Sequence, residues 1–292
     1  MTLQGIWLPI ITPFLDDEID YESYQRLINH YIPKGISGLI PLGTTGESPT
    51  IAEAEYETLI ETTLTIVDNR IPVYVGIGGN CTKKVLNALK TLERYPVQGI
   101  LSVCPYYNRP SQQGLFEHFV NISEATDLNI MVYNIPYRTG INLENDTLLK
   151  LAEFRNIVAV KDSCGNLKQS LELLACKPDD FSVLTGEDIM LYMTLVHGGD
   201  GGVLAASHLE TEQFVKIFHL VRQNDHQAAL QHWWKLAEWI PFLFQEPNPA
   251  PVKYYLQRLG LIRSFETRLP LVEVSEELKQ QLEQRLLKLF SQ

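Results

Sequence analysis

The chain of 292 residues is 45% hydrophobic and 20% charged, a composition that is ordinary for a globular protein and excludes a fibrous or disordered one. Its formal net charge of −11 repels nucleic acid and anionic membranes, so neither is an expected partner, and a small anionic substrate would need a local cation. The four cysteines have no metal-ligand spacing and are too few for a disulfide scaffold, which predicts reduced thiols and no metal site.

The apolar residues near the start of the chain do not have the order of a signal peptide. The run from residue 6 to residue 14 is short and is twice interrupted by proline. No run approaches the roughly 18 apolar residues of a membrane-spanning helix. We therefore expect a cytoplasmic protein that makes no membrane contact.

Eight short apolar runs rich in β-branched residues recur along the chain and predict eight strands. They are residues 6–12, 37–42, 72–76, 98–104, 129–133, 157–161, 181–184 and 201–205. The longer stretches between them have the periodicity of amphipathic helices. The first helix is expected to begin at an Asp20 cap and to end near Gly35, and the second has the capping-box spacing at Thr50 and Glu53.

The alternation of strand and helix predicts a parallel sheet covered by helices. An open doubly wound sheet should carry a GxGxxG turn after its first strand, but that strand continues into Thr12, Pro13 and Phe14. Eight units with no further strand favour closure, so the predicted fold is α/β, a (β/α)8 TIM barrel with a C-terminal helical extension. Residues 1–209 are expected to supply the barrel strands and active site, and residues 210–292 the C-terminal helices that complete the barrel and form an appendage.

In such a barrel the active site lies at the C-terminal ends of the strands. The chemically useful residues at these ends are Thr44, Thr45, Tyr106, Tyr107, Tyr133, Arg138, Lys161, Gly186 and Val203. Lys161 is the most distinctive, because it ends a strand that the barrel would bury on both sides. Burial disfavours the ammonium form and frees the amine to form a Schiff base with a ketone. A lysine that only caps the strand, either snorkelling to solvent or forming a salt bridge for which Asp162 is one candidate, is the structural alternative, and Lys161 by itself does not decide between them.

The other candidates suit Schiff-base chemistry on a keto acid. Hydroxyls of Tyr133, Tyr107 and Thr44 could relay a proton, and Thr45 in its glycine-rich turn could hold a carboxylate. Arg138 offers a planar fork for a second carboxylate. Each also has a structural explanation, as a packing tyrosine, a tight turn or a surface ion pair, and their shared position at strand ends favours function.

Four motifs resemble those of the dihydrodipicolinate synthase family, a branch of the pyruvate-dependent aldolase and lyase superfamily. They are Gly43-Thr44-Thr45-Gly46-Glu47, Tyr133-Asn134-Ile135-Pro136 with Arg138-Thr139-Gly140, Lys161-Asp162-Ser163-Cys164-Gly165-Asn166, and Asn248-Pro249-Ala250-Pro251-Val252-Lys253. The resemblance spans nearly the whole chain. It implies condensation of pyruvate with L-aspartate 4-semialdehyde to 4-hydroxy-tetrahydrodipicolinate, in lysine and diaminopimelate biosynthesis.

The resemblance also implies roles for individual residues. Lys161 forms the imine with pyruvate, so no separate cofactor is needed, and Tyr133 is the central acid and base. Thr44 and Tyr107 complete the relay, with Tyr107 donated by a neighbouring subunit of a homotetramer, a dimer of dimers. Thr45 holds the pyruvate carboxylate and Arg138 that of the semialdehyde. Gly186 lines the substrate site, and Val203 offers its backbone carbonyl near the imine.

Two departures from the family pattern keep alternatives open. Family synthases usually have Glu after the lysine and a small residue before the arginine, where this chain has Asp162 and Tyr137. A 2-keto-3-deoxy sugar-acid aldolase or an N-acetylneuraminate lyase-like enzyme is therefore the second interpretation, and Arg138 argues against a polyhydroxylated substrate. A non-catalytic binding protein on the same barrel is less favoured, because it would not need the lysine.

Many members of the family are inhibited by lysine at a cleft between subunits. The matching positions here are Ser48, Pro49, Glu53, Tyr56, Asn80, Lys84 and Tyr106. Sensitive members typically have an acidic residue in place of Lys84 and histidines in place of Glu53 and Tyr56. The cationic Lys84 would repel an amino group of the effector, which predicts weak or absent feedback inhibition.

Overall fold

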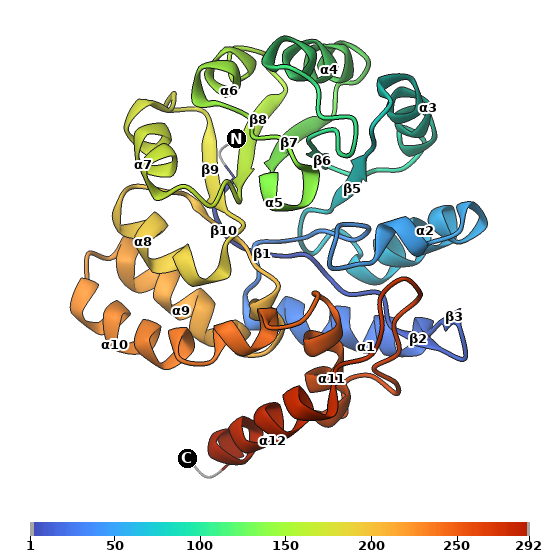
Figure 1. Ribbon diagram of the computed structural model, residues 1–292, viewed down its shortest axis with the longest axis vertical. Helices are drawn as coiled ribbons and strands as arrows, with labels where there is room; N and C mark the ends of the chain where they lie inside the picture. Colours follow the sequence, from blue (N-terminus) through green and yellow to red (C-terminus); the bar gives the residue numbers. More distant parts are fainter. Residues whose placement is uncertain (1–2, 291–292) are drawn as a thin grey trace.

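The computed structural model describes residues 3–290, with side chains described through residue 286. Eight parallel strands form a barrel that a ring of helices surrounds (Figure 1). The strands are β1 (Gly5–Leu8), β4 (Gly38–Leu39), β5 (Tyr74–Gly78), β6 (Gly99–Val103), β7 (Asn129–Asn134), β8 (Ile157–Asp162), β9 (Ser182–Thr185) and β10 (Gly201–Val203). They confirm the predicted strands in number and in order.

Hydrogen bonds close the barrel between β4 and β5, the two strands at the ends of the pairing order. Strands are paired in the order β4-β1-β10-β9-β8-β7-β6-β5. The gap between β4 and β5 is bridged by Leu39 N, which donates to Pro72 O at 3.0 Å, and by Gly76 N, which donates to Pro41 O at 2.9 Å. The sheet therefore has no free edge, and the predicted (β/α)8 barrel is confirmed.

The outer helices follow the strands in chain order. They are α1 (Tyr21–Tyr31), α2 (Glu53–Val67), α3 (Thr82–Leu92), α4 (Gln112–Glu124), α6 (Asn145–Leu151), α7 (Leu167–Cys176), α8 (Leu191–Val196) and α9 (Thr211–Arg222). A short helix α5 (Pro136–Thr139) lies at the mouth of the barrel, close to its centre in Figure 1. Among helices of the described residues, none combines the length and the apolar character needed to cross a bilayer.

The predicted helix starts were right in one case and wrong in the other. Asp20 caps α1 through a hydrogen bond from Ser23 N, and Gly35, with a φ of 86°, ends the single 3₁₀ turn that follows α1. The Thr50 to Glu53 capping box is wrong, because residues 48–50 form their own 3₁₀ turn and Thr50 donates to Glu47 O. Helix α2 is instead capped at Ala52, whose N–H donates to the Glu55 carboxylate at 2.7 Å.

Successive side chains along each strand point alternately out of the barrel and into it, which gives two separate cores. Leu8, Val75, Val132 and Val160 point outward into the core beneath the helices, whereas Trp7, Tyr74, Met131 and Tyr133 point into the barrel. Trp7 and Tyr74 pack edge to face inside it with ring centroids 4.9 Å apart. This period of two places Tyr133, and Lys161 on the next strand, inside the barrel at its C-terminal end.

The C-terminal helices are α10 (His226–Ala237), α11 (Ala250–Arg258) and α12 (Glu276–Phe290). Helix α12 buries Leu278, Leu282 and Leu286, which recur every four residues on one face. Near the start of the chain, between β1 and α1, lies a two-strand hairpin that the sequence did not predict, β2 (Phe14–Leu15) and β3 (Glu18–Ile19). Both residues of its turn, Asp16 and Asp17, have positive φ, and their N–H groups donate to the Glu266 carboxylate.

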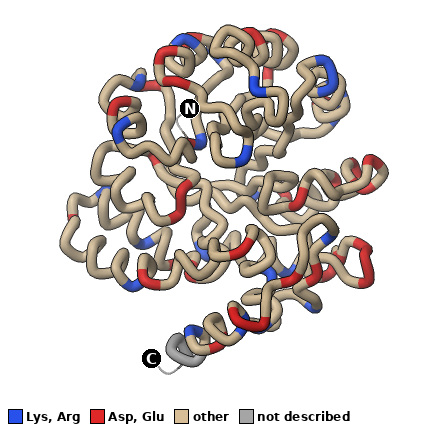
Figure 2. Tube along the Cα trace, viewed as in Figure 1, with Lys and Arg blue, Asp and Glu red and all other residues tan. Residues whose placement is uncertain are grey.

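The charged residues are dispersed over the fold. Lys and Arg positions alternate with Asp and Glu around the ring of helices, and acidic residues gather at the tip of the β2–β3 hairpin (Figure 2).

Candidate active site

Tyr133 and Lys161 are register partners on the neighbouring strands β7 and β8. Both side chains are buried inside the barrel, with exposed fractions of 5% and 6%. The Nζ atom of Lys161 lies 4.1 Å from the centroid of the Tyr133 ring. The structure therefore brings the predicted imine-forming amine and the predicted acid and base into direct contact.

The surroundings of Lys161 destabilise its ammonium form relative to that of a solvent-exposed lysine. Burial lowers the pKa of its amine, and the acidic neighbours Asp188 and Glu187 oppose that shift only in part. Asp162 does not pair with it, because the Asp162 carboxylate accepts hydrogen bonds from Cys164 N at 3.0 Å and from the Ser170 hydroxyl at 2.5 Å. The pairing of Lys161 with Asp162 that the structural alternative offered is thus not found among the described residues.

A small chamber surrounds the Lys161 amine. Its lining includes the predicted residues Thr44, Thr45, Tyr133, Arg138, Lys161, Gly186 and Val203, joined by Tyr137, Asp188, Ala205, Phe244 and Asn248. The chamber shares residues with a cavity of about 770 Å³ toward the C-terminal helices and with one of about 410 Å³ toward α2 and α3. A substrate can therefore approach the amine from the mouth of the barrel.

The glycine-rich turn after β4 holds Thr44 and Thr45 at the chamber. Its flanking residues Leu42 and Glu47 have positive φ values of 59° and 55°, a backbone conformation that is unfavourable for both side chains. Thr45 is buried, and its Oγ1 accepts a hydrogen bond of 2.9 Å from Asn248 Nδ2. A residue of the C-terminal segment thus orients the predicted carboxylate-binding hydroxyl.

A buried ion pair holds the same turn in place. Glu47 and Lys253 form a salt bridge between side chains that are each 0% exposed. Lys253 also donates to Glu266 O at 2.8 Å, and Glu47 accepts from Arg268 N at 3.2 Å. Burial outweighs their mutual attraction, since it raises the pKa of Glu47 and lowers that of Lys253 to about 8.

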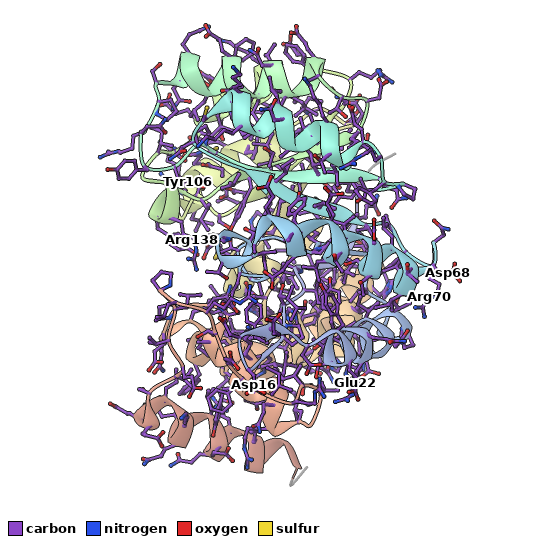
Figure 3. All side chains as sticks on the ribbon, turned by 90° about the vertical axis from the view of Figure 1, so that its right-hand side faces the viewer. Asp16, Glu22, Asp68, Arg70, Tyr106 and Arg138 are labelled. Carbon is purple, nitrogen blue, oxygen red and sulfur yellow. The ribbon has the colours of Figure 1, made fainter. Side chains whose placement is uncertain are left out.

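Arg138 belongs to α5, at the rim of the barrel. It is exposed, lines all three of these cavities and lies over the Tyr137 ring at 5.5 Å. Tyr106 and Arg138 lie on one face of the molecule, and Asp68 and Arg70 lie on the opposite face (Figure 3). This separation matches the expectation that the site lies at the C-terminal ends of the strands.

Asp188 is a site residue that sequence reasoning did not select. It is buried beside Lys161, accepts a hydrogen bond of 2.5 Å from Ala206 N, and has a pKa that burial raises above its usual value. Its position two residues after Gly186, beyond a strand end, was the available signal. Asn248 belongs to a motif of the family, but nothing local in the sequence shows that it reaches Thr45.

Tyr107 is not brought to the chamber within one chain. Its side chain is 89% exposed, and its backbone has a φ of 73°.

The residues of the predicted effector cleft do not all lie in one cavity. Four of them line the 410 Å³ cavity, namely Ser48, Pro49, Tyr56 and Tyr106. The other three are exposed outside it, namely Glu53, Asn80 and Lys84. Burial raises the pKa of Tyr56 to about 12.

The chain is similar to known proteins along almost its full length. The sequence model of the Dihydrodipicolinate synthetase family matches residues 2–289. A 4-hydroxy-tetrahydrodipicolinate synthase 2 of Clostridium acetobutylicum is 53% identical over 282 residues, which are 97% of this chain and 99% of the relative. The crystal structure of a dihydrodipicolinate synthase from Thermotoga maritima has a TM-score of 0.96 at 39% identity and covers 99% of both chains. The enzyme from Cyanidioschyzon merolae, solved with lysine bound, has a TM-score of 0.94 at 35% identity, covering 98% of this chain and 97% of that chain.

Proposed function

Since the chain belongs to the dihydrodipicolinate synthetase family, we propose that it is a Schiff-base lyase that condenses pyruvate with L-aspartate 4-semialdehyde to 4-hydroxy-tetrahydrodipicolinate. The observation that carries the proposal is the buried Lys161 amine, held against Tyr133 in a chamber that also contains two threonine hydroxyls. The relatives favour this synthase over the sugar-acid aldolases and over a non-catalytic protein.

The reaction begins when Nζ of Lys161 attacks the ketone carbon of pyruvate and water leaves, which forms an imine. Tyr133 is the central acid and base, and Thr44 passes the proton on toward Tyr107. Loss of a proton from the pyruvate methyl group gives an enamine, whose carbon bonds to the aldehyde carbon of the second substrate. The amino group of that substrate then attacks the imine carbon, which closes the ring and releases Lys161.

The remaining chamber residues hold the two carboxylates. Thr45, oriented by Asn248, binds the pyruvate carboxylate, and Arg138 at the rim binds the carboxylate of the semialdehyde. Gly186 leaves room for the Lys161 side chain, and Val203 offers its backbone carbonyl near the imine. The imine supplies the electron sink, so this mechanism needs no cofactor.

Tyr107 requires a second subunit in this proposal. Its exposed ring leaves its own chain and completes the relay of a neighbour, in a homotetramer built as a dimer of dimers. The substrates are small molecules, and neither a nucleic acid nor a membrane takes part.

The test combines trapping with turnover. Borohydride reduction in the presence of pyruvate, followed by peptide mapping, should place a covalent adduct on Lys161. Tyr133→Phe should lower kcat by about 10²-fold, the scale of a positioned acid or base, while the adduct stays on Lys161. An adduct on another lysine, or full turnover by the Phe variant, would contradict the assignment.

A further inference from the structure

The second substrate of the proposed reaction carries two charged groups. L-aspartate 4-semialdehyde has a carboxylate and an ammonium group on the same carbon, and only the carboxylate is assigned, to Arg138. An assignment for the ammonium group rests on the proposed function. The cavity of about 770 Å³ that Arg138 lines contains three carboxylates, those of Glu187, Asp188 and Glu246.

Two of these carboxylates are already occupied. Glu246 accepts the backbone N–H of Ser275 at 3.0 Å and also the Ser275 hydroxyl. Asp188 accepts Ala206 N at 2.5 Å and lies buried at the Lys161 amine, on the side of the pyruvate imine. Glu246 is thus held by Ser275, and Asp188 lies beside the imine-forming amine, where it acts on Lys161.

Glu187 differs from both. Its Oε1 atom is buried and has no hydrogen-bond partner among the described residues, although the nearby Ser163 hydroxyl lowers the pKa of the carboxyl and in part offsets the effect of burial. The backbone around it is fixed, because Glu187 N donates to Thr185 Oγ1 at 3.1 Å and the Thr185 hydroxyl donates to Glu187 O at 3.2 Å. A carboxylate oxygen removed from water without a donor is costly, so a ligand that supplies a donor there is favoured.

The charges around the cavity set the orientation of such a ligand. Arg138 follows β7 and Glu187 follows β9, and the Glu187 carboxylate lies close enough for the charges of Lys161 and, more weakly, of Arg138 to act on it. With Arg138 and Glu187 the cavity offers one cationic and one anionic group, which matches the carboxylate and ammonium on a single carbon of an α-amino acid.

We propose that Glu187 binds the ammonium group of the amino-acid aldehyde while Arg138 binds the carboxylate on the same carbon. The aldehyde carbon reacts at the enamine and supplies a third point of attachment. Three of the groups around the α-carbon are therefore held in fixed positions. The site then selects an α-amino aldehyde over an aldehyde acid that lacks the amino group. It also selects one enantiomer, because exchanging the two charged groups would place each against a like charge.

The experiment compares two aldehydes in the wild-type enzyme and in three variants. Glu187→Gln keeps the size of the side chain and removes its charge, and 4-oxobutanoate is the same aldehyde acid without the amino group. Glu187→Gln should lower kcat/KM for L-aspartate 4-semialdehyde about 10- to 100-fold, the range for a lost charge-assisted hydrogen bond. Its effect on 4-oxobutanoate, followed as substrate or as competitive inhibitor, should stay within about twofold.

Glu246→Gln is the matched control, since it removes a carboxylate that lines the same cavity but is bound to Ser275. Both aldehydes should respond to it within about twofold. Glu187→Asp should recover part of the lost kcat/KM. Equal losses for the two aldehydes in Glu187→Gln would overturn the inference, because the carboxylate would then act through Lys161. If the wild-type enzyme neither traps pyruvate nor turns over the semialdehyde, the proposed function itself fails.

Discussion

A Cβ atom at Gly186 would lie 2.5 Å from the Cε atom of Lys161. The same Cβ would lie 2.2 Å from the Ser163 hydroxyl oxygen, and both distances are far inside van der Waals contact. Gly186 therefore defines the space through which the Lys161 side chain reaches the chamber.

Gly186→Ala should displace the Lys161 side chain and lower the rate of imine formation by about 10²-fold, because small misplacements of a reacting group are costly. The fold should be retained with a loss of about 1–3 kcal/mol, as is usual for overpacking. Rapid mixing with pyruvate and thermal unfolding measure the two effects. Gly79→Ala is the control, since its Cβ would meet only Val85 at an ordinary 3.5 Å.

The pH dependence of imine formation should reflect the lowered pKa of Lys161. Only the neutral amine attacks pyruvate, so the rate rises as pH increases through the pKa of the amine in the folded enzyme. This rise should come below the value of about 10.4 that is normal for lysine. Asp188→Asn removes a neighbour that stabilises the ammonium and should move the rise to still lower pH. A rise that stays near the ordinary lysine value in both proteins would contradict this account of the chamber.

The buried pair of Glu47 and Lys253 predicts a strong asymmetry between single and double variants. Lys253→Met leaves the Glu47 charge buried without a partner and should cost about 3–5 kcal/mol, or about 10 °C in Tm. Adding Glu47→Gln should recover most of that loss, because no uncompensated charge remains. As the control, Arg155→Met removes an ion pair whose side chains are 85% and 98% exposed, and Tm should hardly change.

Donation of Tyr107 across a subunit interface can be tested by mixing two inactive variants. Tyr107→Phe lacks the donated hydroxyl, and Lys161→Ala lacks the amine. A mixed dimer contains one site with both groups, so random reassociation should restore about one quarter of the wild-type activity. Recovery requires subunit exchange, which gel filtration of labelled chains checks independently. With exchange demonstrated, mixtures that remain inactive would place Tyr107 outside the relay.

Feedback inhibition by lysine should be weak or absent. Lys84 is exposed at the start of α3, where its ammonium would repel an amino group of the effector. Titration of the initial rate with lysine is the measurement, and half-inhibition at submillimolar lysine would require about 4 kcal/mol or more of binding free energy. Lys84→Glu should increase the sensitivity to lysine if this charge is the determinant.

The barrel and the position of Lys161 could be predicted because both follow from local patterns. Apolar runs mark the strands, and the residue that ends each run lies at the mouth of the barrel. The contact between Tyr133 and Lys161 then follows from the register of adjacent strands.

Other parts of the site could not be predicted from local patterns. Asn248 reaches Thr45 across 203 positions of the chain. Lys253 occurs in a helix with an ordinary sequence, and its complete burial depends on where α11 packs. The β2–β3 hairpin has Asp16-Asp17 in place of the usual Asn-Gly or Asp-Gly turn, so its signal was too weak.

The hydrogen bond from Asn248 to Thr45 and the pair of Lys253 with Glu47 also bear on protein synthesis. Chains emerge from the ribosome N-terminus first, and the early parts begin to fold before the later parts exist. Thr45 and Glu47 are made early, but their partners emerge only after every barrel strand has been translated. A nascent chain can therefore assemble its barrel without an ordered carboxylate site. The carboxylate site can form only once translation has reached the last fifth of the chain. Chains that terminate earlier contain Lys161 but have no organised substrate site.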